Sequence, residues 1–207
     1  MGKQSFRCKI KDWRDIHNGF WLNLRPGYTA LVGPNGAGKT TLLHQIREIA
    51  FSKGYKVFSY SNKTQEFMDR HLAAGDVKEL AKAVIASEGE KTVLNFEATT
   101  GKIGKAVREA IEQDQPLFIL LDNLDSGTSI DRQRELMRFF EMIEQDVGVQ
   151  PGKAEHEVYI LAAVNAYEMA KGICVDVRTG KTMTFGSYEE YANFVSNYFS
   201  NKAITNQ

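Results

Sequence analysis

One stretch of this chain combines glycines, a lysine and threonines at a spacing that suits a triphosphate. It reads Gly33-Pro34-Asn35-Gly36-Ala37-Gly38-Lys39-Thr40-Thr41. The glycines let successive backbone N–H groups turn toward phosphate oxygens, which larger side chains would block. Lys39 supplies a charge for the β- and γ-phosphates, and the Thr40 hydroxyl is a ligand for Mg²⁺. The spacing predicts a binding site for ATP and Mg²⁺ whose contacts come from Asn35, Gly36, Ala37, Gly38, Lys39, Thr40 and Thr41.

A second group follows the apolar run Leu117–Leu121, which ends in Asp122. Such a run is typical of a buried parallel strand with the aspartate at its carboxyl end. We expect Asp122 to be the second anchor of Mg²⁺, mostly through water; the alternative is an aspartate that caps the next turn. With Lys39 and Thr40, this strand end would complete a catalytic site.

Two residues that follow Asp122 could act on an attacking water molecule. Asn123 can orient a water molecule but cannot accept its proton. Asp125 is a candidate base if the loop curls back, although a turn hydrogen bond is its more ordinary role. Lys39, Asp122, Asn123 and Asp125 are therefore the predicted catalytic residues.

The elements around these groups fit the predicted site. Tyr28–Val32 is a short buried strand before the loop, and Leu42, Leu43, Ile46 and Ile49 fall at helical spacing after it. A strand, a glycine loop and a helix N-terminus together place a phosphate at the positive end of a helix dipole.

The remaining pattern alternates strands and helices and predicts an α/β fold. We expect a mostly parallel central sheet with helices on both faces, an N-terminal antiparallel strand pair beside it, and a single domain over residues 1–207. The segments behind this expectation are strands at 5–12, 20–24, 55–60, 117–122 and 157–164, a hairpin at 174–177 and 181–185, and helices at 106–111, 131–147 and after Ser187. Residues 61–83 are polar and then helical; 87–90 interrupt that pattern and open a separate apolar stretch at 92–96.

Two further side chains are weaker candidates for nucleotide contacts. Trp13 lies between the first two strands, where its ring could stack on adenine or pack as an ordinary tryptophan. Gln65 follows the predicted strand 55–60, where its amide could reach the metal or the attacking water, or face solvent.

Bulk composition is that of a soluble globular protein, with 43% hydrophobic and 25% charged residues. The 26 lysines and arginines equal the 26 aspartates and glutamates, so nucleic-acid binding is not indicated, although a local basic patch would permit it. The two cysteines, Cys8 and Cys174, are most simply explained as small residues of the core. With no apolar signal segment and no run of about 20 apolar residues, we expect a cytoplasmic protein without membrane insertion.

Taken together, three segments resemble the ABC-type ATPases, including the heads of SMC- and RecF-like proteins. These are the phosphate loop, Ser87-Glu88-Gly89-Glu90 and Leu120–Gly127. The second segment is similar to the family's Ser-Gly-Gly-Gln/Glu signature, and the third to the Asp-Glu that ends its buried strand. Ser87 lies only 48 positions after Lys39, which leaves no room for a transporter's helical subdomain or a long coiled coil. The resemblance is therefore to a minimal, stand-alone head.

The resemblance implies that two heads sandwich two ATP molecules. Ser87, Gly89 and Glu90 of one head would then contact the nucleotide held by the other, which makes ATP the glue of a homodimer. The chain departs from the family at Asn123, where a glutamate is usual, and at Val164-Asn165, where a switch histidine is usual. Loss of one transition-state contact costs about 10²–10³ in rate, so these departures imply slow hydrolysis of ATP, or none. A long-lived dimer that regulates an unidentified protein partner is the function these features favour.

Three other functions stay open at this stage. The chain could be an active ATPase that uses Asp125 or another carboxylate as its base. It could be a small-molecule phosphotransferase, although no arginine-rich lid segment is evident. It could also be the ATPase subunit of a transporter or of a DNA-processing complex.

Overall fold

The structure, a computed structural model, describes residues 5–12, 19–61, 88–150 and 154–199, and only the backbone of 88–99. Its elements in chain order are β1 (Phe6–Ile10), β2 (Phe20–Leu24), β3 (Gly27–Val32), α1 (Lys39–Ser52), β4 (Lys56–Ser61), α4 (Glu88–Glu112), β5 (Leu117–Asp122), α5 (Ile130–Asp146), β6 (Val158–Ala163), the short 3₁₀ helix η1 (Tyr167–Met169), β7 (Cys174–Asp176), β8 (Thr182–Met183) and α6 (Tyr188–Ser196).

The central sheet has six strands in the order β4-β5-β6-β3-β7-β8. All neighbours are parallel except β8, which pairs antiparallel with β7. Strand β6 lies between β3 and β5, and its Ala163 is in register with both Leu31 and Asp122. The loops that follow these three strands therefore leave the sheet at the same edge, which brings the phosphate loop and Asp122 together.

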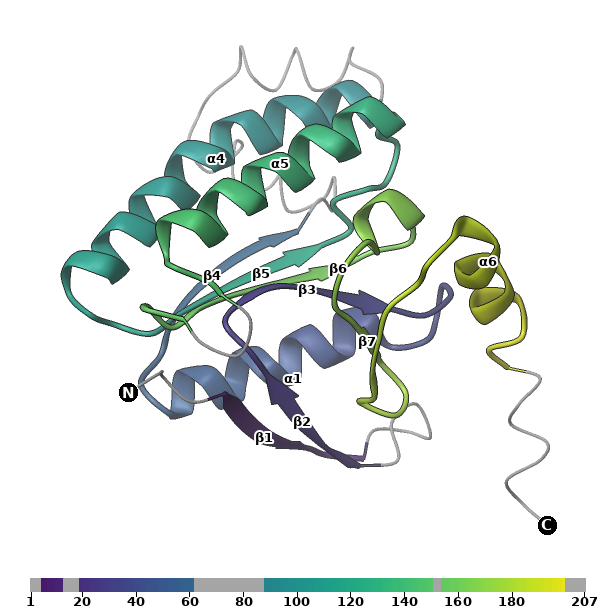
Figure 1. Cartoon of the computed structure of the whole chain (residues 1–207), viewed down its shortest axis with the longest axis horizontal. Coiled ribbons are helices and arrows are strands. Elements are labelled where there is room, and N and C mark those ends of the chain that lie inside the picture. The colour runs from purple at the N-terminus through teal and green to yellow at the C-terminus, as the bar shows by residue number, and fades with distance from the viewer. Residues whose placement is uncertain (1–4, 13–18, 62–87, 151–153, 200–207) are drawn as a thin grey trace, which may run out of the picture.

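Helices cover both faces of the sheet, as predicted. In Figure 1, α4 and α5 lie on one face, and α1 lies on the other beside the β1–β2 pair. Strand β5 shows why: Leu117, Ile119 and Leu121 pack into the core under α4 and α5, whereas Phe118 and Leu120 pack against α1. Successive side chains of a strand point to opposite faces, so an unbroken apolar strand serves two cores.

The N-terminal strand pair is antiparallel, as its alternating pattern predicts. Phe6, Cys8 and Ile10 are buried, while the intervening Arg7 and Lys9 are exposed. The ring of Phe6 packs edge-on to Phe118 of the central sheet, with 4.8 Å between ring centroids. This contact fastens the pair to the same face of the sheet as α1.

The predicted start of the last helix is confirmed by its cap. The Ser187 hydroxyl accepts a hydrogen bond from the Glu190 N–H at 3.2 Å, and α6 begins at Tyr188. Ser129 caps α5 in the same way, through the Arg132 N–H at 3.3 Å. Each cap satisfies a backbone donor that the first helical turn leaves without an intrahelical partner.

The prediction around residues 88–112 is wrong in one respect. The separate apolar stretch at 92–96 and the helix at 106–111 are parts of one continuous helix, α4. A short apolar run fits a buried helix as well as a strand, and Ile103, Val107 and Ala110 continue the helical spacing into the core. Gly89 and Glu90 thus fall in the first turn of a helix. Ser87, Trp13 and Gln65 lie outside the described residues.

Across the described ranges, no helix combines the length and the apolar character that crossing a membrane would require.

Candidate functional site

A cavity of about 360 Å³ opens at the carboxyl edge of the sheet, where β3, β5 and β6 end. It is lined by Pro34, Asn35, Gly36, Gly38, Lys39, Thr40, Thr41, Asp122, Asn123, Ala163 and Asn165. The lining residues come from the ends of β5 and β6, from the loops that follow β3, β5 and β6, and from the first turn of α1. The strand register described above is what brings these segments to one place.

The phosphate loop leads directly into α1. Gly38 precedes the helix with φ 95° and ψ 20°, a left-handed conformation that a residue with a side chain adopts only at a cost. At the other end of the loop, a Cβ on Gly33 would lie 2.9 Å from the Cβ of Ala37 and 3.1 Å from Val177. The glycines therefore allow the turn and the tight packing that aim the N-terminus of α1 at the cavity.

Lys39 is buried, and its ammonium caps the carbonyls of its own loop. Its Nζ donates to the Gly33 carbonyl at 2.5 Å and to the Pro34 carbonyl at 3.1 Å. Burial lowers the pKa of Lys39, while the charges of Asp125 and Asp122 act in the opposite direction. A nearby anion stabilises the charged form of a buried ammonium.

Thr40 and Asp122 both line the cavity and are hydrogen-bonded to each other. The Thr40 hydroxyl lies 3.1 Å from both carboxylate oxygens of Asp122, although the two residues are 82 positions apart in the sequence. A hydroxyl and a carboxylate are ligand types that Mg²⁺ accepts, usually together with water and phosphate oxygens. These two residues fit the predicted metal site and could hold the ion between β5 and the phosphate loop.

Asn123 borders the same cavity in an unusual backbone conformation. Its φ is 58°, in the left-handed region, which asparagine enters more readily than most residues. The backbone conformation at this position thus favours asparagine.

Asp125 is not among the residues that line the cavity, and its carboxylate bonds to a neighbouring loop. Its Oδ2 accepts hydrogen bonds from the backbone N–H groups of Asn165 at 2.5 Å and Ala166 at 2.6 Å. The residue is 6% exposed. The carboxylate links the turn after β5 to the loop after β6, which is a contact with a structural purpose.

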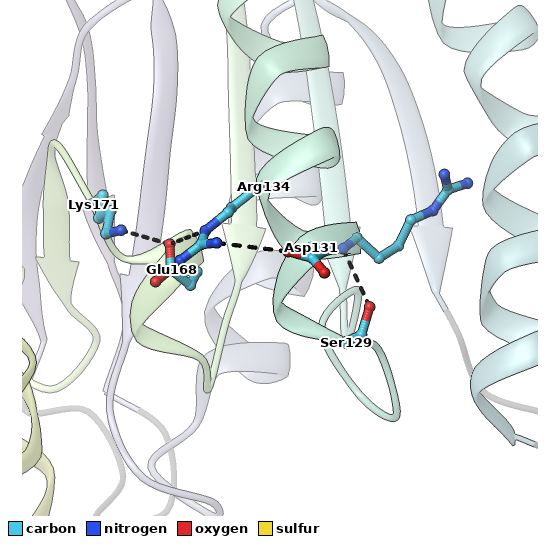
Figure 2. A network of polar contacts seen from close by, with 6 residues as sticks. Ser129, Asp131, Arg134, Glu168 and Lys171 are labelled. Carbon is cyan, nitrogen blue, oxygen red and sulfur yellow. Dashed lines mark hydrogen bonds and ion pairs between the residues drawn. The ribbon is translucent and has the colours of Figure 1, made fainter.

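That second loop is fixed from other sides as well. The Tyr191 hydroxyl, from α6, donates to the Asn165 carbonyl at 2.7 Å. Further along, Glu168 accepts from Lys171 at 2.5 Å and lies 3.5 Å from the Arg134 guanidinium on α5, a network drawn in Figure 2. The hydrogen bond from Lys171 is the first cause of the lowered pKa of Glu168. Of the two residues compared with the switch histidine of the family, Val164 is buried and Asn165 borders the cavity.

The start of the phosphate loop rests on the C-terminal part of the chain. Buried Asp176, at the end of β7, accepts from the Tyr198 hydroxyl at 2.7 Å and from the Thr179 hydroxyl at 2.6 Å. The Tyr198 oxygen would stand 3.2 Å from a Cβ on Gly33. No pattern in the sequence pointed to this support, because it joins residues from two separate elements.

Most of the predicted site residues that the structure describes lie together. The cavity is lined by Asn35, Gly36, Gly38, Lys39, Thr40, Thr41, Asp122 and Asn123. Ala37 differs, because its methyl group packs in the core at 5% exposure. Of Gly89 and Glu90 the structure gives only the backbone, in α4. Ala163 lines the cavity without having been predicted, since an alanine within a buried strand carries no signal of its own.

The fold and the site together define a P-loop ATPase head of the ABC type, with the phosphate loop and the aspartate strand separated by one strand. Residues 7–147, more than half of the chain, match the AAA domain family, and the chain belongs to that family.

Proteins that are similar to part of this chain include two DNA-repair proteins. The chain is similar to the DNA replication and repair protein RecF of Erwinia tasmaniensis, at 44% identity over 34% of this chain and 19% of that protein. It is also similar to the DNA double-strand break repair Rad50 ATPase of Methanopyrus kandleri, at 27% identity over 68% of this chain and 14% of that protein. It therefore spans only a small part of these relatives, and resembles the SMC/RecF-like heads within them.

Proposed function

We propose that this chain binds Mg²⁺ and ATP in the cavity at the carboxyl edge, dimerises around the nucleotide and hydrolyses it slowly or not at all. The bound state would then act as a switch that regulates a partner. One observation supports this most: Thr40 and Asp122 meet beside Lys39, while the next residue is an amide instead of a carboxylate. The site thus has the groups that would bind Mg²⁺ and ATP but lacks the usual general base.

In this proposal, nucleotide binding and ATP hydrolysis depend on different residues of the site. Lys39 and the start of α1 would neutralise the phosphates, and Thr40 and Asp122 would hold the ion. Asn123 would orient a water molecule without taking its proton. ATP would therefore stay bound long enough to hold two heads together.

The proposed dimer depends on residues 87–90. Gly89 and Glu90 stand in the first turn of α4, and a helix N-terminus is a suitable place to contact a phosphate. In the proposed arrangement, Ser87, Gly89 and Glu90 of one copy contact the ATP held by the second copy.

The test is the solution mass of the protein with and without Mg²⁺ and ATP, measured while phosphate release is followed. We expect a shift to twice the monomer mass with little release. Lys39→Ala is the matched control, because it removes the ammonium that the cavity buries; it should bind no ATP and stay monomeric. An unchanged wild-type mass together with steady turnover would contradict the proposed switch.

A second candidate function is an ATPase that acts on nucleic acid, and one surface favours it. Arg7, Lys9 and Lys11 are exposed on the outer side of the β1–β2 pair, within a chain of zero net charge. The Arg7 guanidinium stacks 4.6 Å from the ring centroid of Trp21, which is 58% exposed. Basic groups beside an exposed aromatic ring suit a phosphate backbone with unstacked bases.

Fluorescence anisotropy with a labelled single-stranded DNA tests this candidate. We expect binding that weakens as salt rises, and that falls severalfold in Lys9→Glu and in Trp21→Ala. Glu135→Gln on the exposed side of α5 is a suitable control, because it changes charge far along the chain from this surface. Binding that ignores both changes on β1–β2 would exclude this surface.

A further inference from the structure

The main chain of Asn165 is held from two directions by elements far apart in the sequence. Asp125, in the turn after β5, takes its N–H at 2.5 Å, and Tyr191, on α6, donates to its carbonyl at 2.7 Å. The two contacts reach 40 residues back and 26 residues forward along the chain. Side chains from two distant elements thus bond both backbone groups of this residue.

The Asp125 contact is unusually demanding. One carboxylate oxygen receives two successive N–H groups, from Asn165 and Ala166, while Oδ1 is buried without a hydrogen-bond partner within the described residues. Burial of a charged group is costly unless its bonds are well made. A hydrophobic residue at this position would leave the N–H groups of Asn165 and Ala166 without this acceptor, so Asp125 fixes the backbone at these two residues.

Asn165 lies at the border of two cavities. It is exposed and borders the cavity with Thr40 and Asp122. It also borders a second cavity of about 480 Å³ that lies between α5, η1 and α6 and includes Tyr188 and Tyr191. One residue thus belongs to the nucleotide cavity and to the surroundings of the C-terminal helix.

We propose that Asp125 and Tyr191 are positioning residues that set Asn165 to contact the γ-phosphate and couple that contact to α6. The inference rests on the proposed function, because it requires ATP in the cavity. The Asn165 amide would donate to a γ-phosphate oxygen, a hydrogen bond that ADP cannot accept. Asp125 then supports discrimination between the two nucleotides and takes no proton itself.

The experiment measures the dissociation constants of ATP and ADP for the full chain, using fluorescent analogues with Mg²⁺. Asn165→Ala should weaken ATP binding about tenfold and leave ADP binding unchanged, since a hydrogen bond to a charged group is lost. Tyr191→Phe and Asp125→Asn keep the shapes of the side chains and should each weaken ATP binding about threefold through Asn165.

A matched control removes a tyrosine hydroxyl at the opposite edge of the sheet. Tyr55 donates to Glu157 at 3.4 Å, before β4 and β6 begin. Tyr55→Phe should leave the ratio of the two dissociation constants at its wild-type value. Thermal melting of every variant shows whether a change in binding merely follows a change in folding.

The double variant separates positioning from general structural support. If Tyr191 acts through Asn165, adding Tyr191→Phe to Asn165→Ala should produce no further loss of ATP binding. Independent, additive losses would overturn the inference, and so would wild-type ratios in all three single variants. A wild-type protein that binds neither nucleotide would instead overturn the proposed function, and this inference with it.

Discussion

Asn123 is the residue at which the reasoning about slow turnover can be tested most directly. Its φ of 58° is a conformation that asparagine tolerates and that costs most other residues about 1–2 kcal/mol. Asn123→Glu would supply the carboxylate that the position lacks, at the edge of the cavity that Asp122 also lines. The substitution therefore has two effects of different sign, one on stability and one on chemistry.

The expected magnitudes follow from these two effects. Glu at this φ should lower the free energy of unfolding by about 1 kcal/mol relative to Asn. A positioned general base is worth about 10²–10⁴ in rate, so phosphate release should rise by at least about 10². The rise in rate is far larger than the loss of stability, and the variant should remain folded.

Asn123→Gln is the matched control, because it has the shape of Glu and carries the same backbone strain without a carboxylate. Urea unfolding should show the same loss of stability for both variants, while only Glu raises phosphate release at saturating ATP. Equal acceleration by both would mean that relaxation of the strained turn, and not the missing base, limits turnover. An unchanged rate for Glu, with ATP still bound, would also refute the reasoning.

Three other perturbations have defined outcomes. Ser87→Arg should leave ATP binding by the monomer intact and prevent ATP-driven dimerisation, as measured by solution mass; a variant that still dimerises would remove Ser87 from the interface. Burial lowers the pKa of Lys39 below its ordinary 10.5, so the unfolded chain binds more protons than the folded chain at a pH between the folded and unfolded pKa of this group. In that pH range the nucleotide-free protein should gain stability as pH rises, while its affinity for ATP falls. Lys39→Met should abolish that part of the pH dependence in urea titrations. Burial raises the pKa of Cys8 to about 11 and of Cys174 to about 12, so iodoacetamide at pH 8 should label both only in urea, and rapid labelling of the folded protein would contradict their burial.

The elements nearest the phosphate loop could be predicted because their signals are local. Glycine spacing determines the loop, alternation determines β1, and an unbroken apolar run determines β5. The same local signals failed over α4, because a five-residue apolar stretch fits a strand or a helix equally well. The meeting of Thr40 with Asp122 could be expected from the fold class, since carboxyl ends of parallel strands share an edge.

The contacts that hold the cavity in place could not be predicted in the same way. Asp125 has several plausible partners in any sequence pattern, and its choice of the Asn165 and Ala166 N–H groups depends on how β6 inserts between β3 and β5. Tyr191 looks like an ordinary apolar position of an amphipathic helix. Its hydroxyl becomes informative only when its partner, 26 residues away, is known.

Most residues that make these supporting contacts lie outside the part of the chain that matches the AAA domain family. The match to the AAA domain ends at residue 147, after the phosphate loop and Asp122 but before β6. Asn165, Asp176, Tyr191 and Tyr198 all follow it, and they support the cavity at the loop after β6 and at the start of the phosphate loop. The binding groups thus come from the matched part, while much of their support comes from the part beyond it. Tyr191 links α6 to Asn165 by a direct hydrogen bond, so under the proposed coupling α6 is the element through which a partner would sense or control the nucleotide.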